Sequence, residues 1–263
     1  MLSKKAFFSF VELTDPDKHQ LYNEYHQLDH RPANLALPSV VWGDRWVRSP
    51  SCVRASRASL PPLAETQYVA MYWFADPVDD SVAEWRQLGE RAFQWGRKPD
   101  TDWSRREVGY FVPLQGYVNP RVRVSADVLP FRPVRGVHLT VSLIREPHGA
   151  ATEEMYSWYD RVHIPDLVSR RGVAGAWTFY SEWTTLLDPE QRRIPGAARI
   201  TLLYLDGDPL EFSAELGRYE RDWDSAGRML DTSSMETVLL ETPLLDIRPW
   251  DWSWFAEEEN DQR

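Results

Sequence analysis

The sequence predicts an α+β fold in which two βαββαβ repeats follow one another in one chain of 263 residues. The first observation is a set of landmarks that recur at nearly constant spacing, which indicates an internal duplication. The second is that both halves show the same order of strand-like and helix-like segments. The landmark pairs, 131, 133 and 132 residues apart, are Pro16 and Pro147, His30 and His163, and Tyr72 and Tyr204.

The first repeat begins with AFFSFVELTDP (6–16), an apolar strand pattern that ends in a turn signal. Its second helix carries apolar residues at helical spacing, such as Val82 and Trp85, which gives it one apolar face. The expected strands are 5–13, 39–48, 66–74 and 107–118, and the expected helices are 17–31 and 79–96. The Ser-, Arg- and Pro-rich stretch 48–65 is expected to be a mobile loop.

The second repeat begins with VHLTVSLIREP (137–147), a pattern of the same kind. Asp208-Pro209 ends a strand and opens a helix, as Asp76-Pro77 does in the first repeat, because proline is tolerated in the first turn of a helix. The expected strands are 136–145, 173–183, 198–206 and 236–248, and the expected helices are 151–168 and 209–229.

The βαββαβ order is that of the ferredoxin-like unit, whose two helices cover one face of an antiparallel sheet. The other face is apolar and must be buried. Two fused units with their sheets packed face to face would bury both faces and form an α/β barrel. The expected organisation is repeat 1 at 1–118, a Pro- and Arg-rich linker at 119–135, repeat 2 at 136–250, and a C-terminal tail at 251–263. In that tail we expect the tryptophans to dock on the body and the acidic end to be disordered.

The composition favours small-molecule chemistry over nucleic acid or membrane. The net charge is −10 and no basic stripe is visible, which disfavours phosphate-rich partners. No apolar run approaches membrane-spanning length, and the N-terminal apolar run is too short for a signal peptide. The single cysteine, Cys52, excludes an internal disulfide, so we expect a cytoplasmic protein. The 13 tryptophans suit a large core or a pocket for a flat apolar ligand.

The phrase YDRVHIPDLV (159–168), followed by Gly172-Val173 and a strand, resembles the dimeric α/β-barrel superfamily and within it the EthD-like branch. The first repeat keeps Tyr25, His30 and Pro32, and then Arg45-Trp46 on the strand. The resemblance covers nearly the whole chain and implies the barrel fold. Similar barrels include cofactor-free monooxygenases, lactone isomerases, polyketide cyclases, haem enzymes and proteins with no assigned reaction, so the resemblance alone does not choose an activity.

Three histidines are candidates for proton transfer. His163 lies near the predicted end of a helix, where the helix dipole favours imidazolium and raises the pKa, although a purely capping role is the alternative. His30 takes the same place in the first repeat. His138 lies in an apolar strand; it is a general acid or base if it faces the barrel interior, and a core histidine if it faces the helices.

Several side chains could bind a substrate. Arg45 could hold a carboxylate or phenolate, or could instead pair with a helix carboxylate. The strand tyrosines Tyr72 and Tyr204 could donate hydrogen bonds inside the barrel. The remaining candidates are Tyr159, which shares a helix face with His163, and the strand tryptophans Trp46 and Trp177.

The leading hypothesis is a cofactor-independent isomerase, cyclase or oxygenase that acts on a small, flat, apolar or phenolic molecule in the barrel. No metal is expected, because His26-Gln27-Leu28-Asp29-His30 has zinc spacing but lacks the zincin glutamate and a third ligand. One alternative is a haem protein, since a tandem chain of this size resembles the chlorite dismutase architecture, with His163 or His138 as the ligand. The other is a non-catalytic binding or structural barrel plugged by its own aromatics. A homodimer of the fused barrel is compatible with all three.

Overall fold

The structure is a computed structural model that describes residues 4–99, 103–182, 184, 186, 192–248 and 250–255. Both repeats have the predicted order of elements. The first repeat consists of β1 (Ala6–Leu13), α1 (His19–Tyr25), a π-helical turn (His26–His30), α2 (Arg31–Leu35), β2 (Val40–Val47), α3 (Pro50–Arg54), β3 (Ala58–Ser59), β4 (Tyr68–Phe74), α4 (Val78–Gln94) and β5 (Trp103–Val118).

The second repeat copies this order without the short insertion. It consists of β6 (Gly136–Ile144), α5 (Ala150–Trp158), a second π-helical turn (Tyr159–His163), α6 (Ile164–Val168), β7 (Val173–Ser181), β8 (Ala197–Leu205), α7 (Pro209–Ser225) and β9 (Glu236–Asp246). Asp208 caps α7 by accepting a hydrogen bond from the Leu210 amide, and Pro209 follows in the first turn, as the sequence predicts.

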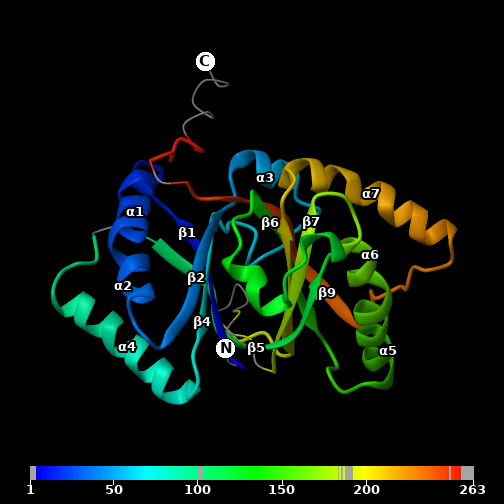
Figure 1. The fold of residues 1–263 in the computed structure, drawn as a ribbon, viewed down its shortest axis with the longest axis horizontal. Coiled ribbons are helices and arrows are strands. Elements are labelled where there is room, and N and C mark those ends of the chain that lie inside the picture. The colour runs from blue at the N-terminus through cyan, green and yellow to red at the C-terminus, as the bar shows by residue number, and fades with distance from the viewer. Residues whose placement is uncertain are drawn as a thin grey trace.

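The strands form one antiparallel sheet in the order β2-β4-β1-β5-β7-β8-β6-β9-β3, and β2 also pairs with β9, so eight of the strands close into a barrel. Each repeat supplies four neighbouring strands in the ferredoxin-like order. The first-repeat helices α1, α2 and α4 flank the barrel on one side, and α5, α6 and α7 flank it on the opposite side (Figure 1). The predicted fold of two fused ferredoxin-like repeats is confirmed.

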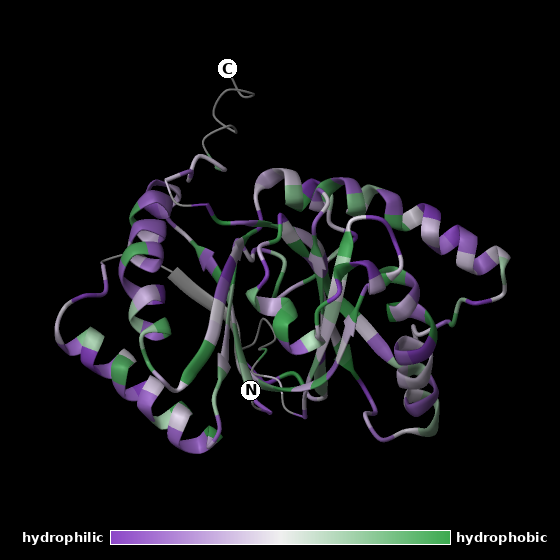
Figure 2. Cartoon of the chain, viewed as in Figure 1, coloured by the Kyte–Doolittle hydropathy of each residue, from purple (hydrophilic) through white to green (hydrophobic). Residues whose placement is uncertain are grey.

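The barrel interior is filled by apolar side chains from both repeats. Because side chains alternate along a strand, Phe8 and Phe10 point inward while Phe7, Ser9 and Val11 face the helices. Phe8 meets Phe179 edge-on with ring centroids 4.9 Å apart, and Trp73 meets Trp177 at 5.0 Å. Figure 2 shows hydrophilic and hydrophobic residues alternating along α4 and α7, as expected for helices with one face on a sheet.

The stretch 48–65, predicted to be a mobile loop, is instead folded onto the barrel. It contains α3 and β3, and β3 pairs with β9. The fully buried Arg48 holds this stretch by hydrogen bonds to five partners: the hydroxyls of Ser56, Ser59 and Thr242 and the carbonyls of Ala64 and Thr66. The composition suggested mobility, but one buried guanidinium satisfies the polar groups of a loop that has few apolar residues.

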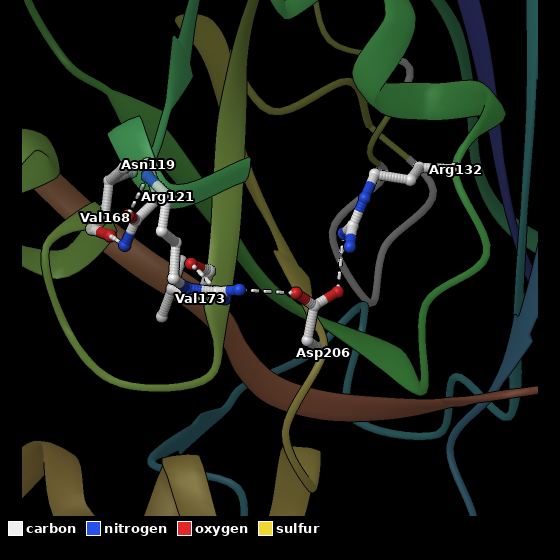
Figure 3. A network of polar contacts seen from close by, with 6 residues as sticks. All are labelled: Asn119, Arg121, Arg132, Val168, Val173 and Asp206. Carbon is white, nitrogen blue, oxygen red and sulfur yellow. Dashed lines mark hydrogen bonds and ion pairs between the residues drawn. The ribbon is translucent and has the colours of Figure 1, made fainter. Parts of the chain in front are cut away.

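The predicted linker crosses between the repeats as an ordered segment. It contains two short 3₁₀ turns, Pro120–Val122 and Ala126–Phe131. Arg121 and Arg132 both donate to the Asp206 carboxylate, at 2.9 and 2.6 Å, and Asn119 donates to the Val168 carbonyl (Figure 3). The Arg residues that marked the linker in the sequence therefore fix it to the second repeat.

The C-terminal aromatic segment returns to the first repeat, as the sequence predicts for its tryptophans. Trp252, Trp254 and Phe255 pack beside a cluster that includes Tyr22 and Tyr68. The Phe255 ring stacks on His19, with centroids 4.0 Å apart. The acidic end of the predicted tail lies outside the described residues. Within the described part of the chain, no helix combines the length and apolarity that crossing a bilayer requires.

Candidate functional site

The described residues line two cavities on the helix-facing side of the sheet, whereas the sequence placed the pocket in the barrel interior. The cavity of the first repeat, here the N-terminal cavity, has a volume of about 730 Å³. Its floor is formed by the outward residues of β1 and β4, and its walls by α1, the π-helical turn, α2 and α4. The principal lining residues are Phe7, Ser9, Val11, Tyr22, Tyr25, His26, His30, Ala70, Tyr72, Trp85, Arg86, Phe93 and Lys98.

Tyr72 forms the end of this floor, and the chain makes room for its ring. Gly43 on the neighbouring strand has no side chain, and a Cβ there would lie 2.3 Å from the Tyr72 ring. Asn34 of α2 donates a hydrogen bond of 3.1 Å to the Tyr72 hydroxyl. Burial raises the pKa of Tyr72 to about 12, so at neutral pH it is a phenol that can donate a hydrogen bond.

The π-helical turn places two imidazole rings in the wall of the N-terminal cavity. His26 and His30 lie edge to face with their centroids 4.8 Å apart. The Tyr25 hydroxyl is 3.3 Å from Nδ1 of His30, and the two rings stack. A partner on Nδ1 fixes the orientation of an imidazole and directs Nε2 elsewhere, which is the arrangement typical of metal-ligating histidines.

Arg45 lies on the same outward face, one strand beyond Ala70 of the floor. Its side chain is 1% exposed, and it donates a 3.0 Å hydrogen bond to the Asn23 amide oxygen. Its guanidinium also lies over the Tyr22 and Tyr68 rings, at 5.2 and 5.5 Å. Among the described residues no carboxylate lies within ion-pair distance of Arg45, so the helix-carboxylate alternative does not apply there. A role for Arg45 in holding an anion stays a prediction.

The second repeat has a smaller cavity in the corresponding place, here the C-terminal cavity, with a volume of about 160 Å³. Both His138 and His163 line it, together with Tyr159, Arg199 and Glu236. The structure therefore brings two predicted histidines together in one repeat and leaves His30 in the other. His138 faces the helices and packs edge-on against Phe212 of α7 at 5.4 Å, so the second of its two predicted orientations is the one observed.

The predicted rise in the pKa of His163 is wrong. The helix does not end at His163; a π-helical turn leads directly into α6, with Pro165 in the first turn. Burial, with a smaller contribution from Arg199 and Arg57, lowers the pKa of His163 to about 3. Burial likewise lowers the pKa of His138 to about 3, with Arg57 adding to it. Both imidazoles are therefore neutral at physiological pH.

Three predicted substrate contacts point into the filled barrel interior, away from both cavities. Trp46, Trp177 and Tyr204 all belong to the central apolar cluster. Tyr204 was paired with Tyr72 at a spacing of 132 residues, but the strands match at 131: Ser9 lies opposite Ala70, as Thr140 lies opposite Thr201. A shift of one residue reverses the face of a strand, so Tyr204 corresponds to the inward Trp73.

The sequence reasoning also missed residues that the structure places at the cavities. Arg199 and Glu236 were not considered, although Arg199 is the one charge in the strand AARITLLYL, a signal that could have revealed it. His26 was set aside with the zinc motif, yet it lines the N-terminal cavity. Within the described ranges, no group of three or more His, Cys, Asp or Glu side chains is placed to hold a metal ion.

Comparison with known proteins supports the fold. No protein-family model and no curated protein matches the chain. Among solved structures, a putative chlorite dismutase matches with a TM-score of 0.50 and 11% identity, over 94% of this chain and 96% of that one. A putative monooxygenase from Fusobacterium nucleatum matches with a TM-score of 0.49 and 8% identity, over 94% and 95%.

A DypB variant from Rhodococcus jostii RHA1, solved in complex with haem, matches with a TM-score of 0.47 and 9% identity, over 94% of each chain. This finding contradicts the expectation that the chain needs no cofactor. That expectation came from the resemblance to cofactor-free barrels, and a solved structure similar in fold contains haem. The match to the putative chlorite dismutase agrees with the tandem ferredoxin-like fold of the chain, and no comparison shows the EthD-like branch.

Proposed function

We propose that the chain is a haem-binding protein that holds its cofactor in the N-terminal cavity, with the His30 imidazole as the axial ligand. The observation that carries the proposal is a large, aromatic-walled cavity with a tyrosine-oriented imidazole in its wall. Bound haem would supply iron for redox or oxygen chemistry, and proximal histidine is a common way of holding it.

The size and lining of the N-terminal cavity suit a flat macrocycle. Its volume of about 730 Å³ lies within the roughly 300–1,000 Å³ typical of sites for large organic ligands. Phe7, Trp85 and Phe93 offer ring faces for stacking. The C-terminal cavity, at about 160 Å³, is below that range, so His138 and His163 are not placed to ligate haem as the sequence suggested.

The charges at the N-terminal cavity suit the carboxylates of a haem. Arg86 and Lys98 are cationic members of the lining and Glu90 is an anionic one, so cations outnumber anions there; Arg86 also lies over the Tyr110 ring and donates to its hydroxyl. Such side chains would pair with propionate groups. Deeper in the cavity, the neutral phenol of Tyr72 would hold a hydrogen bond for a molecule bound beside the cofactor.

Haem titration of the purified chain tests the proposal. We expect a Soret band that saturates at one haem per chain, and at least tenfold weaker binding in His30→Ala. His148→Ala is the matched control, because His148 is exposed and distant in sequence from the cavity. No saturable Soret band, or a wild-type titration in both His30→Ala and His26→Ala, would overturn the assignment.

A second candidate function is the binding of a flat aromatic or phenolic molecule in the same cavity. The EthD-like resemblance of the His-x-Pro phrase suggests this class of ligand. The stacked walls and the Tyr72 phenol support it. The two candidates separate experimentally: a phenolic fluorophore would bind in competition with haem if it occupied this cavity, and His30→Ala would weaken the binding of haem but not that of the fluorophore.

A further inference from the structure

The two cavities have opposite chemical character although they occupy corresponding places in a duplicated fold. The outward residues of β1 and β4 in the N-terminal cavity are mostly apolar or aromatic. The corresponding floor of the C-terminal cavity is mostly polar: its residues on β6 and β8 are His138, Thr140, Ser142, Arg199 and Thr201, with Leu203 as the apolar exception. A polar floor beneath covering helices needs a reason, because burying polar groups is costly unless they find partners.

The three hydroxyls of this floor form a group around Arg199. Thr140 lies directly opposite Thr201, and Ser142 lies directly opposite Arg199, in the β6–β8 register. Cross-strand neighbours of this kind have Cβ atoms about 5 Å apart. Within the described part of the chain, none of the three hydroxyls has a hydrogen-bond partner. Hydroxyls and a guanidinium on one surface are the donors that bind a carboxylate.

The protein does not supply hydrogen-bond acceptors for all the donors of the Arg199 guanidinium. Its side chain is 4% exposed, lies 4.2 Å above the Tyr159 ring and is 3.5 Å from the Asp160 carboxylate. Its Nε has no hydrogen-bond partner. A buried guanidinium gains most from a carboxylate that accepts two hydrogen bonds, which the long contact to Asp160 does not supply.

The same tyrosine also contacts a carboxylate, that of Glu236. The Tyr159 hydroxyl donates to one oxygen of Glu236, and the other oxygen, Oε2, has no hydrogen-bond partner in a side chain that is 3% exposed. Arg199 lies over the face of the Tyr159 ring and Glu236 accepts from its hydroxyl, and the two charges do not form an ion pair with each other. Glu241, which also lines this cavity, already has a cationic partner: Arg57 lies 3.9 Å from its carboxylate and also pairs with Glu220.

We propose that the C-terminal cavity binds a small α-amino acid, whose carboxylate lies on Arg199 and the hydroxyl floor and whose ammonium group faces Glu236. Two separated charges of opposite sign in one small cavity complement a zwitterion better than they complement a single ion. A volume of 160 Å³ equals that of about five waters at roughly 30 Å³ each, which suits a molecule the size of glycine, alanine or serine. The site is separate from the proposed haem site.

Isothermal titration of the full chain with glycine, L-alanine and L-serine tests this inference, with acetate and methylamine as half-ligands. We expect saturable binding of at least one amino acid, with each half-ligand at least tenfold weaker. Thr201→Val keeps the shape of the floor and removes one donor, and Glu236→Gln removes the charge but can still accept from Tyr159. Each should weaken amino-acid binding at least tenfold.

Ser9→Ala is the matched control, because Ser9 holds the place of Thr140 in the other cavity and should leave amino-acid binding unchanged. Thermal unfolding of each variant checks that it folds, and a variant that does not fold is replaced by Ser142→Ala. Acetate binding as tightly as the amino acids would overturn the zwitterion assignment. The site would be overturned if no amino acid gave saturable heat. It would also be overturned if the folded floor variant (Thr201→Val or Ser142→Ala) and the folded Glu236→Gln variant both bound amino acid as tightly as the wild type.

Discussion

At the scale of single residues, Asp44 shows how burial couples charge to stability. The carboxylate lies 3.6 Å from Arg31 and is near Asp246, where β2 meets β9. Burial raises its pKa to about 6, Asp246 adds to the rise and Arg31 opposes it. The folded state therefore binds a proton that the unfolded state releases near pH 4, so this residue makes the free energy of unfolding fall as the pH rises from about 4 to 6.

Asp44→Asn should remove that dependence and raise the free energy of unfolding at pH 7 by about 1–2 kcal/mol. Urea denaturation at pH 4.5 and pH 7 measures it. Asp79→Asn is the control, since that side chain is 96% exposed and its ion pair with Lys5 lies at the surface, so either value should change by less than about 0.5 kcal/mol. A loss of stability at pH 7 in Asp44→Asn would show that the ion pair with Arg31 outweighs the cost of burial.

Arg48 gives a second residue-scale prediction. It is fully buried and donates to partners in both the 48–65 stretch and β9. Arg48→Met keeps an unbranched stem in the core but leaves five acceptors without their donor, so we expect a loss of about 3 kcal/mol in the free energy of unfolding. Chemical denaturation measures the loss, and Arg54→Met, on the exposed face of α3, should cost less than about 0.5 kcal/mol.

At this scale, prediction from the sequence is limited because neighbouring residues of a strand point to opposite faces of the sheet. Pattern and composition placed both Tyr72 and Tyr204 inside the barrel. Tyr204 lies there, but Tyr72 faces the helices and lines the N-terminal cavity, so the placement of Tyr72 was wrong. The two tyrosines are not equivalent, because one residue of error in aligning the repeats moves a side chain to the other face of the strand. The predicted direction of the His163 pKa was wrong because that direction depends on burial by residues distant in the sequence, which no local pattern contains.

At the scale of elements, the boundaries of the strands and long helices were largely predictable, because periodicity of 2 or 3.6 residues marks them directly. The two π-helical turns and the folding of residues 48–65 onto the barrel could not be predicted from periodicity. A π-helical turn is one residue inserted into a helix, and the insertion leaves the apolar pattern on both sides readable. The recurrence of the turn at His26–His30 and Tyr159–His163 nevertheless explains why the His-x-Pro phrase appears twice.

Deletion of Leu28, a half-exposed residue in the first π-helical turn, should convert that turn to regular α-helix. Tyr25 and His30 would then be four residues apart, and their hydrogen bond would no longer form as it does now. We expect unchanged helical circular dichroism and at least tenfold weaker haem binding. Leu28→Ala keeps the turn and serves as the control. Wild-type haem affinity in the deletion variant would show that the π-helical turn is not required for haem binding.

At the scale of the whole molecule, the shared core makes the two repeats one folding unit. Neither repeat has a complete interior of its own, since Phe8 and Trp73 of the first meet Phe179 and Trp177 of the second. The β5–β7 and β2–β9 pairings join the repeats at both edges. Duplication predicted this arrangement from the sequence, because an uncovered apolar sheet face must find a partner.

Equilibrium unfolding of the whole chain should therefore show a single transition, with far-UV circular dichroism and tryptophan fluorescence coincident. Phe8→Ala and Phe179→Ala should each lower the free energy of unfolding by about 3–4 kcal/mol without separating the two signals. Because the rings touch, the double variant should lose about 1 kcal/mol less than the sum of the two. Two resolved transitions in either single variant would mean that one repeat stays folded while the other opens, and the barrel would then consist of two independently stable halves.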